Sequence, residues 1–547
     1  MTTTEANIDS SDATAEAESS GDNIYLLFAS NDHKTIGRLW IATSLIFLVA
    51  VSVLSIVTGI ERASLDGIDV FSALSDYFQG WTLVRTASVF LVALPLFIGI
   101  ATVVVPLQVG AGGIAFPRLA AAAFWSWLVA SGVHIASFIA DGGLGPDFGT
   151  SRDATLLTLT SLGFLVVSLL AASLCIATTV IALRPTGMTL LRVPAFSWSM
   201  LVATSVWLLS LPVLIANLIY AWADLQGRDP IAFGNPDRLW SDLEWVFQQP
   251  QILSFAIPVL GVLAEIGPVS AKVRQANREV LLTLIGLFGA LSFGAWAQHA
   301  FSRGADPTFE DGNLIYEEAL YVLFGLAIFL PTIGVIGGVA DTIRRGSVPK
   351  PSAALVGATA GALLLLVAVV VGELRVIPLW DALHEDNVLL SSATAQFTAV
   401  IAAVTASAVG ALAYWSPKIF GGYVKEPLAI MAVLALLAGG VVAAVADIVS
   451  AFLGQPDISI SSAVDSGVET LNIMATMGLV MMALGAMLLV GSLLTAAGSG
   501  EVLPDDPWDG HTLEWAAPSP PPMGNFVEEL APVVSAAPLL DEFEEVS

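Results

Sequence analysis

Apolar runs of about twenty residues recur along this chain, and they constrain its fold more than any other feature of the sequence. Each run is long enough to cross the roughly 30 Å hydrocarbon core of a bilayer as an α-helix. Only 12% of the residues are charged, which is about half the fraction found in soluble domains. The sequence therefore predicts an all-α integral membrane protein.

Twelve spans are predicted from the length of the apolar runs and from the charges that flank them. They lie near residues 37–60, 82–106, 119–140, 157–183, 195–222, 246–266, 279–300, 316–340, 353–374, 388–416, 427–453 and 471–497. The membrane domain is predicted over residues 32–497, between an acidic N-terminal tail (1–31) and an acidic, proline-rich C-terminal tail (498–547). We expect the N-terminal tail to be disordered, and the C-terminal tail to be disordered or extended along the protein.

The lysine and arginine residues predict which ends of the spans face the cytoplasm. With a cytoplasmic N-terminus, thirteen of the twenty basic residues fall in inner segments and seven in outer segments. Cytoplasmic loops carry such an excess in membrane proteins. Both termini are therefore predicted to be cytoplasmic.

The cysteine count and the charge exclude some classes of site. Cys175 is the single cysteine, so the chain has no internal disulfide and no multi-cysteine metal site. The net charge is −27, and the outer segment 224–244 is acidic. An acidic outer surface could attract a basic partner such as a cytochrome c, although adaptation of the proteome to salty water, or simply solvated tails, explains the charge better. No phosphate-binding loop, nucleophile–base pair or nucleic-acid surface is recognised.

Six local runs carry a resemblance to a known family. They are residues 32–37 (Asp-His-Lys-Thr-Ile-Gly), 105–119 (with Val-Pro-Leu-Gln-Val-Gly-Ala and Ala-Phe-Pro-Arg-Leu), 245–250 (Trp-Val-Phe-Gln-Gln-Pro), 295–299 (Ala-Trp-Ala-Gln-His), 414–421 (Tyr-Trp-Ser-Pro-Lys-Ile-Phe-Gly) and 506–522 (with Asp-Pro-Trp, Thr-Leu-Glu-Trp and Pro-Ser-Pro-Pro-Pro). In this order they resemble runs of the haem-copper oxidases, specifically of cytochrome c oxidase subunit I. The resemblance covers roughly residues 32–526.

This resemblance implies a fold, cofactors and an activity. The fold would be the twelve-helix arrangement of subunit I in a bacterial plasma membrane. The family's cofactors are haem A and copper, and its activity is the transfer of electrons from cytochrome c to oxygen with proton pumping. Subunits II and III would be the partners, alongside membrane lipids.

The ligand positions of the family are nearly all changed in this chain. Six helical histidines hold two haems and a copper in the family, because haem iron needs an axial imidazole and copper binds neutral imidazole nitrogens. Here only His134 and His299 fall within predicted spans. The matching positions carry Gln249, Gln298 and His299 for copper, Gln396 for the high-spin haem, and Val84 and Thr398 for the low-spin haem. Of these six positions, only position 299 still carries a histidine. Gln251 stands where the family has its proton-delivering glutamate.

These replacements predict no catalytic, cofactor-binding or metal-binding residue, and neither haem nor copper. Gln249, Gln298 and Gln396 can both donate and accept, so we expect them to form a hydrogen-bonded network with His299 that closes the metal cavity. Chance replacement, since glutamine is one base change from histidine, and a single-copper site at His299 are the alternatives. His134 is expected to be a hydrogen-bonded core residue.

Three functions from different classes follow. The favoured hypothesis is a non-catalytic relative of subunit I, acting as a structural or assembly subunit beside subunits II and III or beside an active paralogue. The second is an active terminal oxidase, against which the missing histidines argue. The third is a transporter or small-molecule binder that uses the cavities in which the family holds its cofactors.

Overall fold

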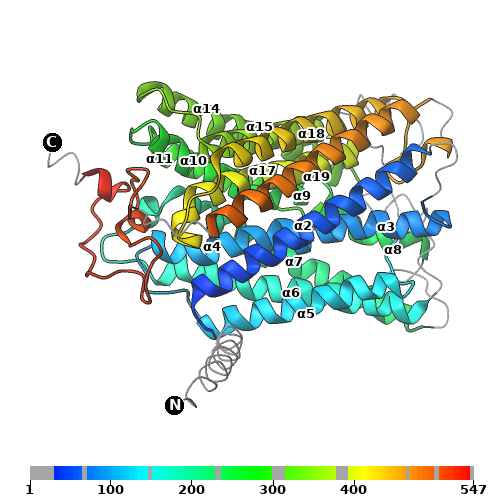
Figure 1. Cartoon of the computed structure of the whole chain (residues 1–547). Helices are drawn as coiled ribbons and strands as arrows, with labels where there is room; N and C mark the ends of the chain where they lie inside the picture. Colours follow the sequence, from blue (N-terminus) through cyan, green and yellow to red (C-terminus); the bar gives the residue numbers. More distant parts are fainter. Residues whose placement is uncertain are drawn as a thin grey trace, which may run out of the picture.

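The computed structural model describes residues 30–64, 70–145, 151–227, 236–297, 314–376, 392–463, 467–497 and 504–541. Over these ranges the chain forms a bundle of long helices that run side by side (Figure 1), and no strand occurs among them. The all-α membrane fold predicted from the sequence is thereby confirmed.

The helices have the following bounds. The first half contains α2 (His33–Ala63), α3 (Leu74–Ala87), the π-helical turn η1 (Ser88–Ala93), α4 (Leu94–Gln108), α5 (Pro117–Ile139), α6 (Arg152–Ala182), η2 (Leu190–Arg192), α7 (Ala195–Leu225), α8 (Pro236–Leu243), η3 (Glu244–Phe247), α9 (Gln251–Ser254) and α10 (Ile257–Ser270). The second half contains α11 (Arg278–Leu291), η4 (Ala295–Ala297), α13 (Leu314–Ala327), α14 (Phe329–Arg345), α15 (Ala353–Val376), α17 (Ser392–Phe420), α18 (Glu426–Phe452), η6 (Ser461–Ala463), α19 (Glu469–Ala497) and η7 (Leu513–Ala516).

Eleven helical segments of the described chain are long and apolar enough to cross a membrane. The predicted span near residues 279–300 is the exception, because its helix α11 contains 14 residues. At about 1.5 Å per residue, α11 is roughly 21 Å long, short of the hydrocarbon core. The chain leaves the helix after α11. The backbone N–H of Gly294 donates to Oε1 of Gln251 (2.9 Å) and not to a carbonyl oxygen of the preceding helical turn.

Three spans form the centre of the bundle. The most apolar stretches of α3–η1–α4, of α9–α10 and of α17 are entirely buried, whereas those of α2, α14 and α19 are mostly on the outside. The central position of α17 follows from its composition, since its many alanines let α15 and α18 approach closely. Val84 lies on the first of these spans, Gln249 directly before the second, and Gln396 and Thr398 on the third.

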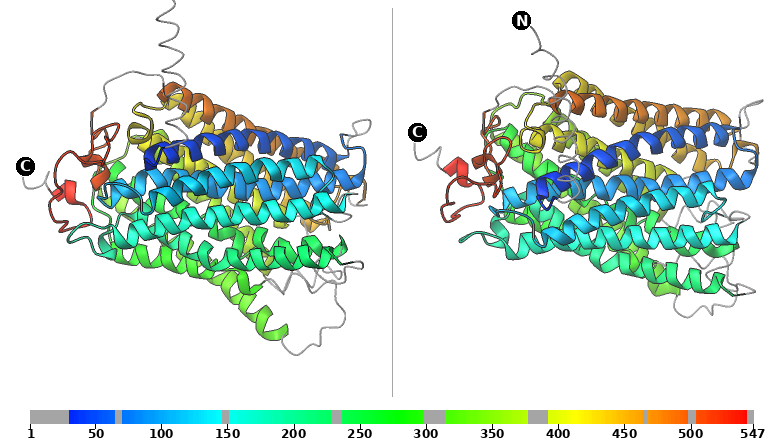
Figure 2. Two further views of the ribbon diagram at one scale, coloured as in Figure 1. Left: turned by 90° about the horizontal axis from the view of Figure 1, so that it is seen from below. Right: turned by 60° about the horizontal axis from the view of Figure 1, so that its bottom comes forward.

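Residues 504–541 pack across one end of the bundle. Both views of Figure 2 show this segment in red against the same end, which is also where α2 begins and α19 ends. Lys418 donates from Nζ to the carbonyl oxygens of Asp505 (2.9 Å) and Ala517. The Trp508 indole donates to the carbonyl of Tyr414 (3.0 Å). Runs that carry the resemblance, although far apart in sequence, therefore meet at this end.

Candidate functional site

Gln249 and Gln396 meet at the centre of the bundle. Nε2 of Gln396, on α17, donates to Oε1 of Gln249 (2.6 Å) and to the carbonyl of Ala368 on α15 (3.2 Å). Both side chains are 1% exposed. Two of the four members of the network predicted from the sequence are thus in direct contact.

The backbone of α15 lies directly against this amide pair. A Cβ atom at Gly372 would overlap both Oε1 of Gln249 and Nε2 of Gln396, and one at Gly325 would meet Nε2 of Gln249. Glycine at 372 therefore allows α15 to fill the space beside the pair. An amide that already donates to two oxygens, in contact with backbone, does not fit as an axial ligand of haem.

The other half of the predicted network, Gln298 and His299, lies outside the described residues. Within the described chain, Nε2 of Gln249 and Oε1 of Gln396 have no hydrogen-bond partner. The participation of Gln298 and His299, and the copper alternative at His299, stay predictions. No group of three or more His, Cys, Asp or Glu side chains suited to a metal occurs in the described ranges.

Gln251 and His134 have complete sets of hydrogen bonds. Nε2 of Gln251 donates to the hydroxyls of Ser210 (3.0 Å) and Ser254 (2.9 Å), and its Oε1 accepts from the backbone of Gly294. This neutral side chain, at the position predicted to match the proton-delivering glutamate, therefore links α9 to α7 and to the chain that follows α11. The ring nitrogens of His134 lie 3.1 Å from Ser161 Oγ and 3.2 Å from Thr86 Oγ1. The prediction of a hydrogen-bonded core histidine at 134 is confirmed.

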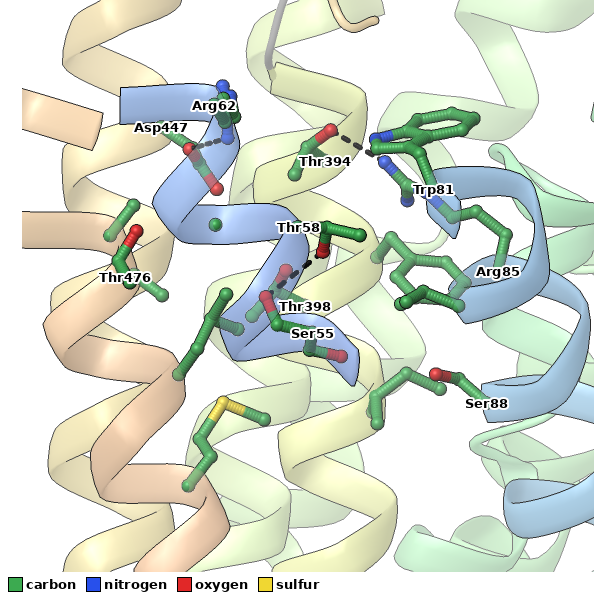
Figure 3. Close-up of a pocket in the computed structure, with 18 of the residues that line it drawn as sticks. Ser55, Thr58, Arg62, Trp81, Arg85, Ser88, Thr394, Thr398, Asp447 and Thr476 are labelled. Carbon is green, nitrogen blue, oxygen red and sulfur yellow. Dashed lines mark hydrogen bonds and ion pairs between the residues drawn. The ribbon is translucent and has the colours of Figure 1, made fainter. Parts of the chain in front are cut away.

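The two low-spin positions border a cavity instead of a closed contact. Val84 on α3 and Thr398 on α17 line a cavity of about 90 Å³ between α2, α3, α17, α18 and α19 (Figure 3). Several water-sized molecules would fit, because one needs about 10–15 Å³ by the same measure. Valine and threonine offer no imidazole to haem iron, so these residues do not fit a low-spin haem.

Arg62, Arg85 and Asp447 line one end of this cavity, and both arginines belong to buried arginine–aspartate pairs. Nη1 of Arg62 lies 2.7 Å from Oδ1 of Asp447, and the two side chains face each other in Figure 3. Nη2 of Arg85 lies 3.5 Å from Oδ2 of Asp457. All four charges are nearly inaccessible to solvent, so each pair must offset the desolvation of its own members.

Aromatic rings and Thr394 hold Arg85 in place. Its guanidinium carbon lies 4.3 Å from the ring centroid of Trp81 and 4.2 Å from that of Phe397. Nη2 also donates to Oγ1 of Thr394 (2.6 Å), whose backbone N–H donates to Asp457 (2.8 Å). Reasoning from the sequence missed this cluster, because its members come from α2, α3, α17, α18 and a loop with no common motif.

Comparison with known proteins places these features in a family context. The family described as cytochrome c and quinol oxidase polypeptide I matches residues 35–488. Cytochrome c oxidase subunit 1 of Bacillus subtilis (strain 168) is 28% identical over 533 residues, which cover 94% of this chain and 82% of that protein. The same subunit of Bacillus sp. (strain PS3) is 27% identical, covering 91% and 81%. That of Corynebacterium efficiens is 28% identical, covering 92% and 87%.

Proposed function

The chain belongs to the cytochrome c oxidase subunit I family, and from this membership and its replaced ligand positions we propose that it is a non-catalytic subunit of a respiratory complex. Membership of the family supports a multi-pass bacterial membrane protein and implies association with other oxidase subunits and with lipids. Our proposal is that this chain does not itself reduce oxygen and has a structural or assembly role.

The observation that carries the proposal is the Gln249–Gln396 contact. In the family, the matching positions hold copper and the high-spin haem. Here the two amides bond to each other and to the backbone of α15, which lies against them at Gly372. A porphyrin at this place would require both the separation of the pair and an imidazole that neither residue supplies. The loss of histidine ligands and the close packing of α15 against Gln249 and Gln396 both argue against a haem at this place.

A structural or assembly role agrees with what the chain retains. The runs at residues 105–111, 414–421 and 506–522 join one end of the bundle through buried hydrogen bonds, such as Gln108 Nε2 to Glu514 Oε1 (3.0 Å). These contacts join α4, α17 and the segment 504–541 through protein atoms alone. We propose subunits II and III or an active paralogue as the protein partners, with cytochrome c at the acidic outer loops as a weaker candidate.

Two other functions are weighed against this proposal. An active terminal oxidase would need ligands for two haems and a copper, and Val84, Gln249, Gln396 and Thr398 supply no imidazole. A small-molecule binder is the second candidate, because one specific observation favours it: the cavity beside Val84 and Thr398 is present, whereas the Gln249–Gln396 region is filled.

Purification of the full chain in a mild detergent tests the proposal. We expect no Soret or α absorption bands, less than a tenth of an equivalent of copper, and co-purification of oxidase subunits identified by mass spectrometry. A haem-loaded oxidase purified in parallel controls for cofactor loss in the detergent. Stoichiometric haem A or copper would overturn the non-catalytic assignment, and isolation as a lone protein would overturn the structural role.

A further inference from the structure

The cavity beside Val84 and Thr398 is elongated and has two chemically different ends. It adjoins a second chamber of about 40 Å³ and shares with it the side chains of Ser55, Ser88, Ile401, Leu479 and Met482. The second chamber adds four aliphatic side chains, Leu48, Val51, Val92 and Leu436, and the hydroxyl-bearing Ser52 and Thr405. The combined space runs from the Arg62 and Arg85 end, along α2 and α17, to an apolar end between α2 and α18.

Arg62 presents unpaired donors at the polar end. Its Nη1 bonds to Asp447, whereas Nε and Nη2 are buried without a hydrogen-bond partner among the described residues. These two nitrogens form one edge of the guanidinium group, with two parallel N–H bonds that match the two oxygens of a carboxyl group. Buried donors of this kind normally have partners, so the free edge indicates a ligand with paired oxygens.

Asn472 and the charge balance narrow the chemistry of that ligand. Oδ1 of Asn472 lines the same end and also lacks a partner among the described residues, while its Nδ2 donates to Ser461 Oγ (2.7 Å). Arg62 and Arg85 are already balanced by Asp447 and Asp457. The site is therefore neutral as it stands, so it favours a ligand that can bind in an uncharged form, as a protonated carboxyl group can, over a phosphate, which remains charged.

We propose that this cavity binds a long-chain fatty acid, with its carboxyl group on the Nε–Nη2 edge of Arg62. The hydrocarbon chain extends past Thr398 and Ser88 into the chamber lined by Leu48 and Leu436. A single acyl chain matches a narrow cavity with one polar and one apolar end. The proposal rests on the cavity and on Arg62, and it is independent of the proposed role in a respiratory complex.

Binding of radiolabelled palmitic acid to the full chain, purified and delipidated in detergent, tests the inference. We expect saturable binding of one palmitate per chain, with palmityl alcohol and methyl palmitate competing at least tenfold more weakly. Arg62→Lys keeps a positive charge for Asp447 but lacks the two-donor edge, so its affinity should fall at least tenfold. Thr398→Leu adds side-chain volume in the middle of the cavity and should abolish saturable binding.

Gly163→Leu provides a matched control. Gly163 lines an apolar groove between α6 and α7, and a Cβ atom there meets nothing within 4 Å, so the added side chain leaves the proposed site untouched. Palmitate affinity should equal that of the unmodified chain. Thermal unfolding of each variant checks folding, and Thr398→Leu carries the test if Arg62→Lys unfolds. Equal palmitate binding by the folded Thr398→Leu variant, or equal competition by the alcohol, would overturn the proposal.

Discussion

At the scale of single residues, the positions predicted to match the family's ligands fall into two physically different groups. Gln249 and Gln396 carry amides, which donate and accept, and they share one buried hydrogen bond. Val84 and Thr398 carry small side chains, and a cavity lies beside them. Replacement by amides thus accompanies a closed contact, and replacement by small residues accompanies retained space.

The glutamine pair leads to a prediction about stability. Gln396→Leu should destabilise the protein by about 1–3 kcal/mol, because it leaves Oε1 of Gln249 buried without its donor. The double variant Gln249→Leu/Gln396→Leu should lose less than the sum of the two single variants, since both polar groups are then absent. Unfolding by denaturant in detergent micelles measures the coupling free energy. Additive effects of the two substitutions would show that the hydrogen bond contributes nothing.

Among the elements, the segment 504–541 is distinguished by a buried acid. Glu514 in η7 accepts hydrogen bonds from Gln108 (3.0 Å) and Trp415 (3.3 Å). Burial, assisted by the nearby charge of Glu265, raises the pKa of Glu514 to about 7. When this segment detaches, the carboxyl returns to its ordinary pKa of about 4.5. The attached state therefore favours the protonated acid, and its advantage declines as the pH rises from about 4.5 to 7.

Replacement of Glu514 by glutamine should remove this contribution to the pH dependence. Protection of residues 504–541 from hydrogen exchange should fall between pH 5 and pH 8 in the unmodified chain, relative to Glu514→Gln at each pH. Burial also lowers the pKa of His511 to about 4, so the contribution of this histidine favours attachment increasingly as the pH rises toward about 6.5. His511 is present in both proteins, so the comparison with Glu514→Gln isolates the contribution of Glu514. Glu528→Gln, an exposed carboxylate of the same segment, is the control. Identical pH profiles for Glu514→Gln and the unmodified chain would contradict the prediction.

On the scale of the whole molecule, basic residues assigned to inner segments meet the acidic C-terminal segment at one end. Lys34 contacts Asn525 (3.3 Å), Lys272 pairs with Asp509 (2.7 Å), and Arg274 pairs with Asp541 (2.5 Å). The exposed Lys272–Asp509 pair is solvated and contributes little on its own. Together, these contacts place several of the predicted inner segments at the same end of the bundle, as a common cytoplasmic side requires.

The cytoplasmic location of both termini stays a prediction, and reporter fusions test it. Green fluorescent protein attached after Ser547 should fluoresce in the bacterial host, whereas alkaline phosphatase at the same place should be inactive, because the phosphatase needs the oxidising periplasm for its disulfides. Phosphatase inserted after Gly227, beyond the end of α7 in the acidic outer segment, should be active and serves as the control. The reverse pattern would invert the topology.

The sequence by itself determined the all-helical membrane fold and the family, whereas the residues at the ligand positions stay a prediction from the resemblance. These properties follow from the length and polarity of local segments, which each helix expresses independently of its neighbours. The spans were found in this way, except that α11 is shorter than expected because the end of its predicted span interacts with Gln251 instead.

Tertiary structure alone decided which polar groups meet. Arg62 and Asp447 are 385 residues apart, and nothing in either local sequence identifies the other as its partner. The contact of Gln249 with Gln396, the close approach of Gly372 and the cavity beside Val84 likewise depend on how each helix is rotated about its axis. That rotation is set by packing against several neighbours at once, so it emerges only when the whole bundle is assembled.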